Sequence, residues 1–467
     1  MTIQRIVVAL CGTLVLAACN NFDVPDLNRP LLDQVSAQPT PVTVAALATG
    51  LVGGSRADIA ERIGYVSELG ILGRESYVLS GSDDRFVAEL LNGSSLDPST
   101  PNFGGNFWVA PYANLRNANL LIDSLPKVDG LTDPQKESVR GFAKTMMALD
   151  LLKIINTHDF YGAAIDVDLP VGQLAPIVSK DEVFTRIALL LDQAQVHLAA
   201  ASPAFPFGLG NGFNSFNLPG QVLTPAQFLL VNRALAGRVA VYRGKFPEAL
   251  TALAASFLDT GAPLSLGAYH AYGNGSGDSQ NSLNTTDILA HPSIVSDADP
   301  LSPAPPGCNP LPVPSVLTCL DNRLQAKVTA VTPVSLYKLT SAYGFILYPS
   351  TDSPVAIIRN EELILLRAEA NIGLVLANNP AGDLGAAKKD INTIRAAAGI
   401  ANATGLDKTN ILDELLKQKR YSLLFEGGHR WIDARRYGKL GTLPIDVPGQ
   451  YVQTAFPIPT AETDARH

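Results

Sequence analysis

Apolar residues recur every three or four positions over most of the chain, which is the period of an amphipathic helix. Val44, Leu47 and Leu51 begin this pattern, which predicts helices within residues 41–92. Further helices are expected at about 108–125, 134–155, 180–201, 225–243, 247–258, 360–377, 384–398 and 410–426. Asp133 is expected to cap the third helix, with Pro134 in its first turn. The pattern predicts a mainly α-helical (all-α) protein.

Two segments interrupt the helical pattern. Residues 203–223 are rich in glycine and proline, and residues 260–335 are dominated by Gly, Ser, Asn, Asp and Pro with little periodicity. Residues 447–460 are expected to form a closing extended segment. We therefore expect one domain over residues 41–467, with little β structure and a long irregular insertion at about 260–335.

One helical hairpin carries a repeat-like motif. Gly237, Gly244, Phe246 and Ala249 stand at offsets that resemble those of a tetratricopeptide repeat. Small residues let two antiparallel helices approach closely, and Gly244 suits the turn between them. The sequence therefore predicts tetratricopeptide-like helical pairs.

The N-terminus has the pattern of a lipoprotein export signal. Arg5 precedes an apolar run from Ile6 to Ala18, which is too short for a membrane-spanning helix and suits a signal peptide over residues 1–18. Small residues lead into Cys19, so we expect Cys19 to be the lipidated (palmitate-bearing) N-terminus of the mature chain. The alternative is an ordinary signal peptide with an incidental cysteine. Residues 19–40 are expected to form a tether.

Localisation follows from the same segment. Asn20, and not an aspartate, follows the cysteine, so the inner-membrane retention signal of enteric bacteria is absent. We expect an outer-membrane, lipid-anchored protein exposed at the cell surface. The formal charge of −8 and the pI near 5.3 argue against nucleic-acid binding, which relies on Lys and Arg.

Two cysteines remain after the signal and the lipid site. Cys308 and Cys319 close a proline-rich loop, and in an oxidising exported compartment such a pair usually forms a disulfide. Two free thiols are the alternative. No histidine stands nearby at the spacing of a zinc site, so no metal site is expected there.

The C-terminal third combines charged residues with apolar helices. Glu361, Glu362, Arg367 and Glu369 lie in a helix otherwise made of Leu, Ile and Ala, and buried charges need partners. The expected partners are Arg395, Arg430, Asp433 and Arg435, in a network of Arg–carboxylate pairs that locks the helices together. Gly399 and Gly427-Gly428 are expected to end two of the helices.

A catalytic interpretation of this region is the rival hypothesis. It would use Glu426, His429 and Asp433. The sequence has no Gly-x-Ser-x-Gly elbow, His-Glu-x-x-His motif, phosphate loop or dinucleotide fingerprint. The framework interpretation is therefore favoured, and no enzyme activity or cofactor is expected.

Four sequence blocks then follow in order over residues 354–462. They contain Arg359-Asn-Glu-Glu362, Asn392-Thr-Ile-Arg395, Glu426-Gly427-Gly-His-Arg430-Trp-Ile-Asp433-Ala-Arg-Arg436 and Phe456-Pro-Ile-Pro459. Their order and spacing resemble the C-terminal signature of the SusD/RagB family. Trp108-x3-Tyr112-x6-Asn119 and Phe160-Tyr161-Gly162 resemble its N-terminal part. The residues carried over as structural signature are Arg359, Glu362, Arg367, Glu369, Asn392, Arg395, Glu426, Gly427, Arg430, Asp433 and Arg436.

The resemblance implies a SusD-like fold and a function in nutrient uptake. Such a lipoprotein captures an oligosaccharide or peptide and delivers it to a SusC-like TonB-dependent barrel transporter. Oligosaccharide is the expected ligand, and peptide or another nutrient is the alternative because the chain has only two tryptophans, both within framework motifs.

Aromatic and polar loop residues are the candidate ligand-binding groups, because aromatic faces stack on sugars and polar groups bind their hydroxyls. The candidates are Tyr77, Asp84, Arg85, Phe207, Phe213, Phe216, Tyr269, His270, Tyr272 and Asn274. Ordinary loop packing is the alternative for each. Asp278, Asp287, Asp297 and Asp299 could hold Ca²⁺, but they lack the spacing of a known calcium loop and are expected to be solvated turn residues.

Two other functions remain open. One is a tetratricopeptide-type scaffold lipoprotein in envelope assembly, which would have no barrel partner. The other is a lipid-anchored hydrolase, which would need a cleft with an acid–base pair.

Overall fold

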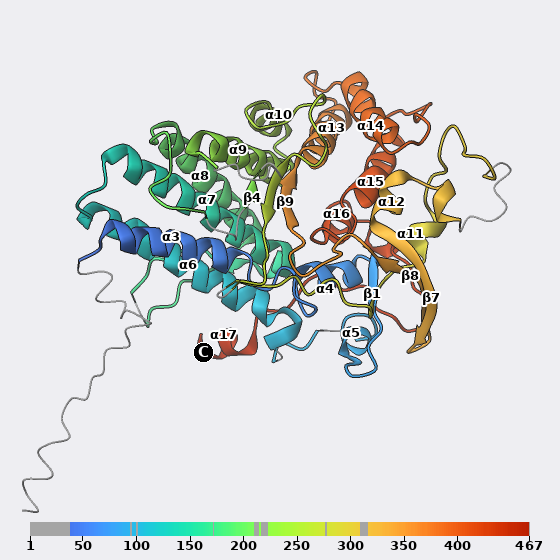
Figure 1. The fold of residues 1–467 in the computed structure, drawn as a ribbon, viewed down its shortest axis with the longest axis horizontal. Helices are drawn as coiled ribbons and strands as arrows, with labels where there is room; N and C mark the ends of the chain where they lie inside the picture. The colour runs from blue at the N-terminus through green and yellow to red at the C-terminus, as the bar shows by residue number, and fades with distance from the viewer. Residues whose placement is uncertain are drawn as a thin grey trace, which may run out of the picture.

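The structure, a computed structural model, describes residues 38–93, 96–99, 101–170, 172–209, 214–215, 223–275, 278–308 and 316–466. The predicted signal peptide and Cys19 lie outside these residues, as do Phe213 and Phe216. The described part is mainly helical, as the sequence predicts (Figure 1). None of its helices combines the length and apolar character that a membrane crossing requires.

Layered antiparallel helices form one half of the molecule, on the left of Figure 1. Neighbouring helices in the sequence pack side by side there: α6 on α7, α7 on α8, α8 on α9 and α9 on α10. These helices are α3 Pro41–Ser55, α6 Asn106–Ser124, α7 Asp133–His158, α8 Lys180–Ala199, α9 Pro225–Tyr242 and α10 Phe246–Ala254. The apolar stripes predicted from the sequence meet in one core, which includes Leu51, Phe142 and Phe228.

Three of these helices begin with the same local device. The side chains of Thr132, Ser179 and Thr224 each accept a hydrogen bond from the backbone three residues later, where a Gln or Glu returns one. This capping box satisfies backbone N–H groups that a helix start leaves free. The predicted cap of α7 at Asp133 is wrong by one residue, because Thr132 is the cap and Asp133 begins the helix.

The α9–α10 hairpin has the close packing that its small residues predict. A Cβ on Gly237 would lie 2.6 Å from Cδ2 of Leu253 in α10, so only glycine fits there without a shift of Leu253. Gly244 has φ of +67° in the turn between the two helices, a conformation that favours glycine.

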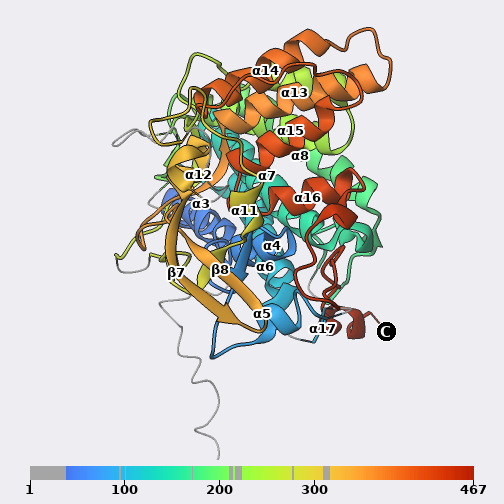
Figure 2. The same ribbon diagram turned by 90° about the vertical axis from the view of Figure 1, so that its right-hand side faces the viewer.

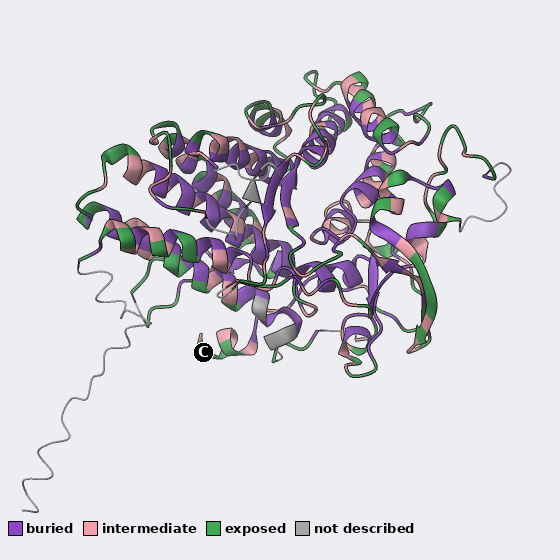
Figure 3. Ribbon diagram, in the orientation of Figure 1, coloured by how far each residue is buried: buried purple, intermediate pink, exposed green. Residues whose placement is uncertain are grey.

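The region expected to be irregular contains a sheet. Its strands follow the order β1-β6-β8-β7, all antiparallel. They are β1 Ser76–Val78, β6 Ile288–Ala290, β7 Val328–Leu336 and β8 Leu339–Phe345. The long β7–β8 hairpin turns at Tyr337 and Lys338, both with positive φ, and its outer strand β7 is largely exposed (Figures 2 and 3).

Two smaller sheets connect the parts of the molecule. β4 Asn214–Ser215, β5 Gly267–His270 and β9 Val355–Arg359 form one, and β2 Ala163–Ala164 pairs with β3 Ile177–Val178 in the other. β9 leads directly into α13, so the pairing of β5 with β9 fixes where the C-terminal helices begin.

The C-terminal helices enclose a second and a third core. They are α13 Asn360–Leu376, α14 Leu384–Ala397, α15 Ile411–Ser422 and α16 His429–Arg436. α13, α14 and α15 pack around Ile364, Ile391 and Leu415. Trp431 of α16 and Phe456 join the core beneath the sheet, together with α4 Tyr65–Leu72. α16 was not predicted, and Gly427-Gly428 lead into it where the sequence analysis expected them to end a helix.

Short elements complete the chain. They are α5 Arg85–Ala88, α11 Ser293–Ser296, α12 Asn322–Lys327, α17 Thr460–Asp464, a π-type turn Pro101–Gly105 and the short turns Leu125–Lys127, Asp159–Tyr161, Leu317–Cys319 and Leu440–Thr442. Residues 447–459 form no strand. They are held by backbone contacts such as Phe456 N–H to the Thr157 carbonyl, at 2.9 Å.

Arg74 joins the two ends of the chain. Its side chain is fully buried, and its guanidinium donates to the carbonyls of Ile71, Pro444 and Tyr451 at 3.2, 3.1 and 3.0 Å. The N-terminal α4–β1 connection is thereby fixed to the C-terminal segment.

Candidate functional site: a polar surface on a buried ion-pair framework

The C-terminal signature residues form buried ion pairs. Glu426 accepts from Lys327 Nζ at 2.7 Å and from Arg359 Nε at 2.8 Å, and Arg359 also pairs with Glu361. Burial alone would raise the pKa of Glu426, but Arg359 and Lys327 lower it to about 2. Glu426 is therefore a fixed negative charge that ties β9 and α12 to the segment before α16.

A second network surrounds Glu369. Its carboxylate accepts from Lys419 at 2.8 Å, Arg436 at 2.8 Å and the Tyr437 hydroxyl at 2.7 Å. Lys419 and Arg436 also each lie 2.6 Å from Asp433. Burial would raise the pKa of Glu369, but Lys419 and Arg436 lower it to about 2. This network joins α13, α15 and α16.

The other signature charges have partners that the sequence analysis did not name. Arg238 pairs with Glu362, Arg367 with Asp390, and Arg395 with Asp299 and Glu414. Of the four expected partners only Asp433 takes part, through Lys419 and Arg436. Arg430 instead donates to the Arg74 carbonyl at 2.8 Å, and Arg435 lies 3.2 Å from Asp159.

Two signature residues shape the backbone. Asn392 Oδ1 accepts from the Ala403 N–H at 2.8 Å and so holds the segment after α14. Gly427 has φ of +135° and Gly428 φ of +73°, and a Cβ on Gly428 would lie 2.3 Å from Cβ of Leu69. The turn into α16 therefore requires glycine.

The ion pairs of Glu426 and Asp433 argue against a catalytic role for these residues. Glu426 and Asp433 are each held by two cationic side chains. Burial lowers the pKa of His429, so this ring is neutral at pH 7. A carboxylate with a pKa near 2 cannot act as a general acid at neutral pH. The arrangement supports a framework.

A cavity of about 70 Å³ lies where the helical half meets this framework. Lys153, Asn156, Arg238, His270 and His429 are among its lining residues. Nδ1 of His270 and Nδ1 of His429 have no partner among the described residues. Burial lowers the pKa of His270 to about 3. The cavity is large enough and polar enough for several ordered waters.

Most of the predicted aromatic ligand residues are buried. Tyr77 is 2% exposed and its ring lies 4.8 Å from that of His291, while Phe207 packs 5.0 Å from Phe142. The Tyr269 hydroxyl donates to the Ser265 carbonyl at 2.5 Å. His270 and Tyr272 are also buried, at 4% and 7% exposed. These side chains therefore form no exposed platform in this structure, and they contribute to the packing of the core.

The remaining candidates are at the surface. Asp84 is exposed, and the half-buried Arg85 is held by Asp83 at 2.8 Å and by the ring of Phe103 at 4.9 Å. Asn274 is exposed and accepts from the Thr351 hydroxyl at 2.9 Å.

Three segments meet around Asp84 and Arg85. The Leu79 N–H donates to the Asp287 carbonyl at 2.9 Å, and the Tyr337 hydroxyl donates to the Ser80 carbonyl at 2.8 Å. The loop after β1, the loop before β6 and the β7–β8 turn thus form one polar surface, which we call the ligand-side surface. Its members are Ser82, Asp84, Arg85, Asn284, Thr286, Tyr337 and Lys338. The hairpin was not predicted, although residues 328–345 are rich in Val, Thr and Tyr, which favour strands.

A second surface is apolar. A groove of about 530 Å³ beside α6 is lined by the exposed side chains of Val109, Leu169 and Leu174. The exposed rings of Phe160 and Tyr161, 4.4 Å apart, precede the β2 strand whose Ala164 also lines the groove. Exposed apolar residues gathered in this way mark interaction surfaces.

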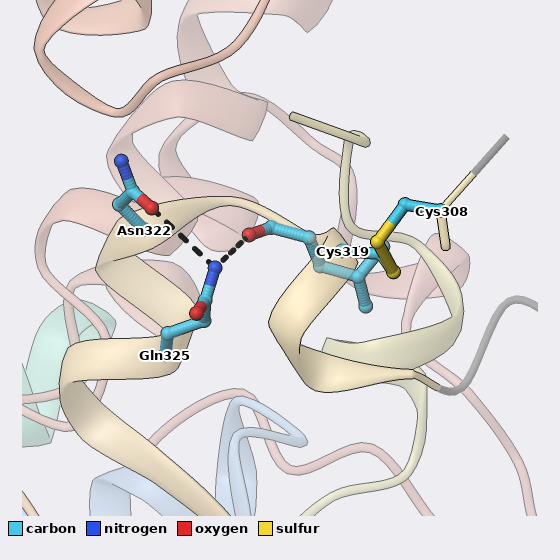
Figure 4. The surroundings of a disulfide bond; sticks show 5 residues. Cys308, Cys319, Asn322 and Gln325 are labelled. Carbon is cyan, nitrogen blue, oxygen red and sulfur yellow. Dashed lines mark hydrogen bonds between the residues drawn. A yellow bond between two sulfur atoms is a disulfide. The ribbon is translucent and has the colours of Figure 1, made fainter. Parts of the chain in front are cut away.

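Cys308 and Cys319 are joined by a disulfide with a Cα–Cα distance of 5.5 Å (Figure 4). The Gln325 side chain donates to the Leu320 carbonyl at 2.5 Å beside it. The backbone bridge between Leu301 and Ile400 joins this segment to the end of α14.

The four aspartates considered for Ca²⁺ are each paired with a cation. Asp278 contacts Arg56, Asp287 contacts Arg62, Asp297 contacts Arg420, and Asp299 contacts Lys417 and Arg395. Among the described residues, no group of three or more His, Cys, Asp or Glu side chains could hold a metal ion.

The described chain is a mainly helical protein. Its helices, joined by buried ion pairs, carry loops and the β7–β8 hairpin at the surface. Residues 332–465 match the model of the SusD family. A SusD superfamily protein from Bacteroides vulgatus has a similar structure, with a TM-score of 0.63, 13% identity and coverage of 91% of this chain and 97% of that one. No curated protein sequence matches the chain.

Two further structures are similar over the same extent. A SusD-like carbohydrate-binding protein from Bacteroides fragilis has a TM-score of 0.67 at 13% identity, covering 91% of this chain and 98% of that one. A laminarin-binding SusD-like protein has a TM-score of 0.61 at 19% identity, covering 91% and 97%. Residues 332–465 therefore resemble the SusD family in sequence, and the chain shares its fold with SusD-like proteins over most of its length.

Proposed function

We propose that this protein is a surface-exposed outer-membrane lipoprotein that captures an oligosaccharide and delivers it to a SusC-like TonB-dependent barrel transporter. The observation that carries the proposal is the fold shared with a SusD-like carbohydrate-binding protein over 91% of the chain, together with the family match at residues 332–465. Cys19 would carry the lipid, and residues 19–40 would link it to α3.

The ligand-side surface is the proposed capture site. Asp84, Arg85 and Asn284 supply carboxylate, guanidinium and amide groups of the kind that bind sugar hydroxyls. Asp83 and Phe103 fix Arg85 in place, which lowers the entropy that it would lose on binding. Tyr337 offers a partly exposed ring at the hairpin turn.

Calorimetric titration with a panel of oligosaccharides and peptides tests the capture site. Arg85→Ala and Tyr337→Ala should each weaken saccharide binding at least about tenfold, the equivalent of 1.4 kcal/mol. Arg186→Ala on α8 is the matched control and should bind like the parent protein. If neither ligand-side variant alters saccharide binding, the ligand-side surface is not the capture site. Binding of peptides and of no saccharide would reject the proposal that the ligand is an oligosaccharide.

The apolar groove beside α6 supports contact with a protein partner. Its lining also includes Asp123, Asp166 and Asp168, so a partner surface with apolar and basic groups would complement it. We propose that the barrel transporter docks on this groove.

A mild-detergent pull-down of the tagged protein from its native membrane tests the partner. A stoichiometric TonB-dependent barrel is expected, and Leu174→Glu should reduce its recovery while Leu189→Glu, at an exposed position of α8, should not. Recovery of envelope-assembly factors in place of a barrel would favour the tetratricopeptide-type scaffold that the α9–α10 hairpin resembles. Loss of membrane association in Cys19→Ala would support the lipid anchor.

A further inference from the structure

A groove of about 440 Å³ is lined by residues of α15, α16 and the segment after α16, together with Asp297. Figure 2 shows where α11, α15 and α16 lie in the fold. Its lining is rich in cations, in a chain with a formal charge of −8. The cationic lining residues are Lys417, Lys419, Arg420, Arg430 and Lys439. No member of the ligand-side surface lines it.

Four of these cations are neutralised by neighbouring carboxylates. Lys417 pairs with Asp299, Lys439 with Asp413, and Arg420 with Asp297. Lys419 belongs to the buried network around Glu369. Arg430 differs, because its hydrogen bond goes to the neutral carbonyl of Arg74 and it forms no ion pair with a carboxylate among the described residues.

The second guanidinium at the groove is that of Arg420, and only its shielded Nε lacks a hydrogen bond among the described residues. Arg420 uses one terminal nitrogen for Asp297 and the other for the Ser293 hydroxyl, both at 2.8 Å. Burial and the charge of Arg420 lower the pKa of Arg430 to about 9, which shows that the two guanidinium groups repel each other.

Glu75 is the carboxylate that most raises the pKa of Arg430, but no ion pair joins the two side chains among the described residues. Burial raises the pKa of Glu75 to about 7, so at neutral pH it is ionised only about half of the time. Neither of its oxygens has a hydrogen-bond partner among the described side chains. Asp297, Asp413 and Asp433 also line the groove, and Arg430 is its one cation without an ion pair among the described residues.

We propose that this groove binds the oxyanion of an acidic saccharide, a uronate carboxylate or a sugar sulfate, at Arg420 and Arg430. Guanidinium groups bind such oxyanions with paired, charge-assisted hydrogen bonds. The groove volume lies in the range of small-molecule sites and accommodates a sugar ring beside its charged group. The inference rests on the proposed function, because it names the class of oligosaccharide that the protein captures.

Calorimetry on the full chain at low salt tests the proposal with oligogalacturonate and with its methyl ester, which is the neutral match. The acid should bind at least about tenfold more tightly than the ester, and 150 mM salt should weaken it. Arg420→Gln and Arg430→Lys should each lower affinity for the acid about tenfold or more. Arg186→Gln on α8 is the control for loss of one positive charge and should leave binding unchanged.

Three outcomes would overturn the inference. The first is equal binding of acid and ester, and the second is unchanged affinity in Arg420→Gln. The third is displacement by inorganic sulfate or phosphate with no preference for the saccharide, which would indicate an adventitious ion only. Neutral-glycan binding at the ligand-side surface, or recovery of the barrel, would leave the proposed function standing in each case.

Discussion

The guanidinium of Arg238 in α9 makes two hydrogen bonds of 2.6 Å to the carboxylate of Glu362 in α13, and both side chains are buried. The pair joins the helical half of the molecule to the C-terminal framework. Removing only the cation would leave a buried, unpaired carboxylate. We therefore expect Arg238→Met to lower the free energy of unfolding by about 3–5 kcal/mol, measured by urea denaturation.

A double variant separates two free energies: the cost of leaving Glu362 buried without a partner, and the contribution of the Arg238–Glu362 pair to stability. Arg238→Met with Glu362→Leu should recover most of the loss, because an apolar pair needs no ionic partner. Arg243→Met breaks the more exposed pair with Glu248 and should cost less than about 1 kcal/mol. Equal losses at the two arginines would contradict the prediction.

Acid should destabilise the protein through its buried carboxylates. The pKa values of Glu369 and Glu426 are lowered to about 2 from a usual 4.5, so their stabilising effect is complete above pH 4.5. It is lost as the pH falls from 4.5 towards 2, by about 3 kcal/mol for each group. Urea denaturation at a series of pH values measures this slope. Glu426→Gln should be less stable at pH 7 and should show a shallower slope, and an unchanged slope would disprove the assignment.

Glu75 should change the pH dependence of stability in the opposite direction to Glu369 and Glu426. Burial raises its pKa to about 7, so the folded protein binds its proton more tightly than the unfolded chain and stability falls as the pH rises from 4.5 to 7. Glu75→Gln mimics the neutral acid. Its advantage over the parent protein should widen by about 2 kcal/mol between pH 5 and pH 8. Glu248→Gln is the control for loss of a surface charge, and a constant advantage at Glu75 would refute the prediction.

Gly162 should tolerate no side chain. Its φ is +74°, and an added Cβ would lie 1.9 Å from the Val178 carbonyl oxygen of β3. Gly162→Ala must therefore separate β2 from β3, and we expect a loss of more than about 2 kcal/mol in thermal or urea unfolding. Gly172 also has positive φ, but a Cβ there meets open space. Gly172→Ala should cost only about 1 kcal/mol, and similar losses at both sites would show that backbone strain alone matters.

The long helices could be predicted from the sequence because each has a sustained apolar stripe and a local start signal. The residues of α7 and α8 show both. α16 was missed because half of its eight residues, His429–Arg436, are charged and the helix is too short for a periodic pattern. The β7–β8 hairpin was missed although its residues favour strands, because Pro333 within β7 is a residue that usually argues against a strand.

The sequence predicted that buried Arg–carboxylate pairs would hold the C-terminal helices together. It did not predict which residues pair with one another. Glu362 is paired with a residue 124 positions away, and Arg359 with one 67 positions away. Pairs between residues so far apart depend on how whole helices pack, and a local sequence pattern does not indicate that packing. The aromatic candidates for ligand binding were expected in loops. Tyr77 and Tyr269 instead lie in the strands β1 and β5, and both are buried, as is Tyr272. The resemblance to the SusD family was predicted from ordered motifs at 354–462, which fall within the matched residues 332–465.

The buried guanidinium of Arg74 limits the order in which the chain can reach its native state. Two of its acceptors, on Pro444 and Tyr451, lie 370 and 377 residues further along the sequence. Synthesis delivers Arg74 long before them, and contacts between such distant residues form slowly because a long loop must close first. Until the last 24 residues are available, Arg74 cannot be buried without leaving donors unsatisfied. Burial of Arg74 therefore couples the α4–β1 region to a segment that is synthesised much later, and the two regions are expected to become ordered together.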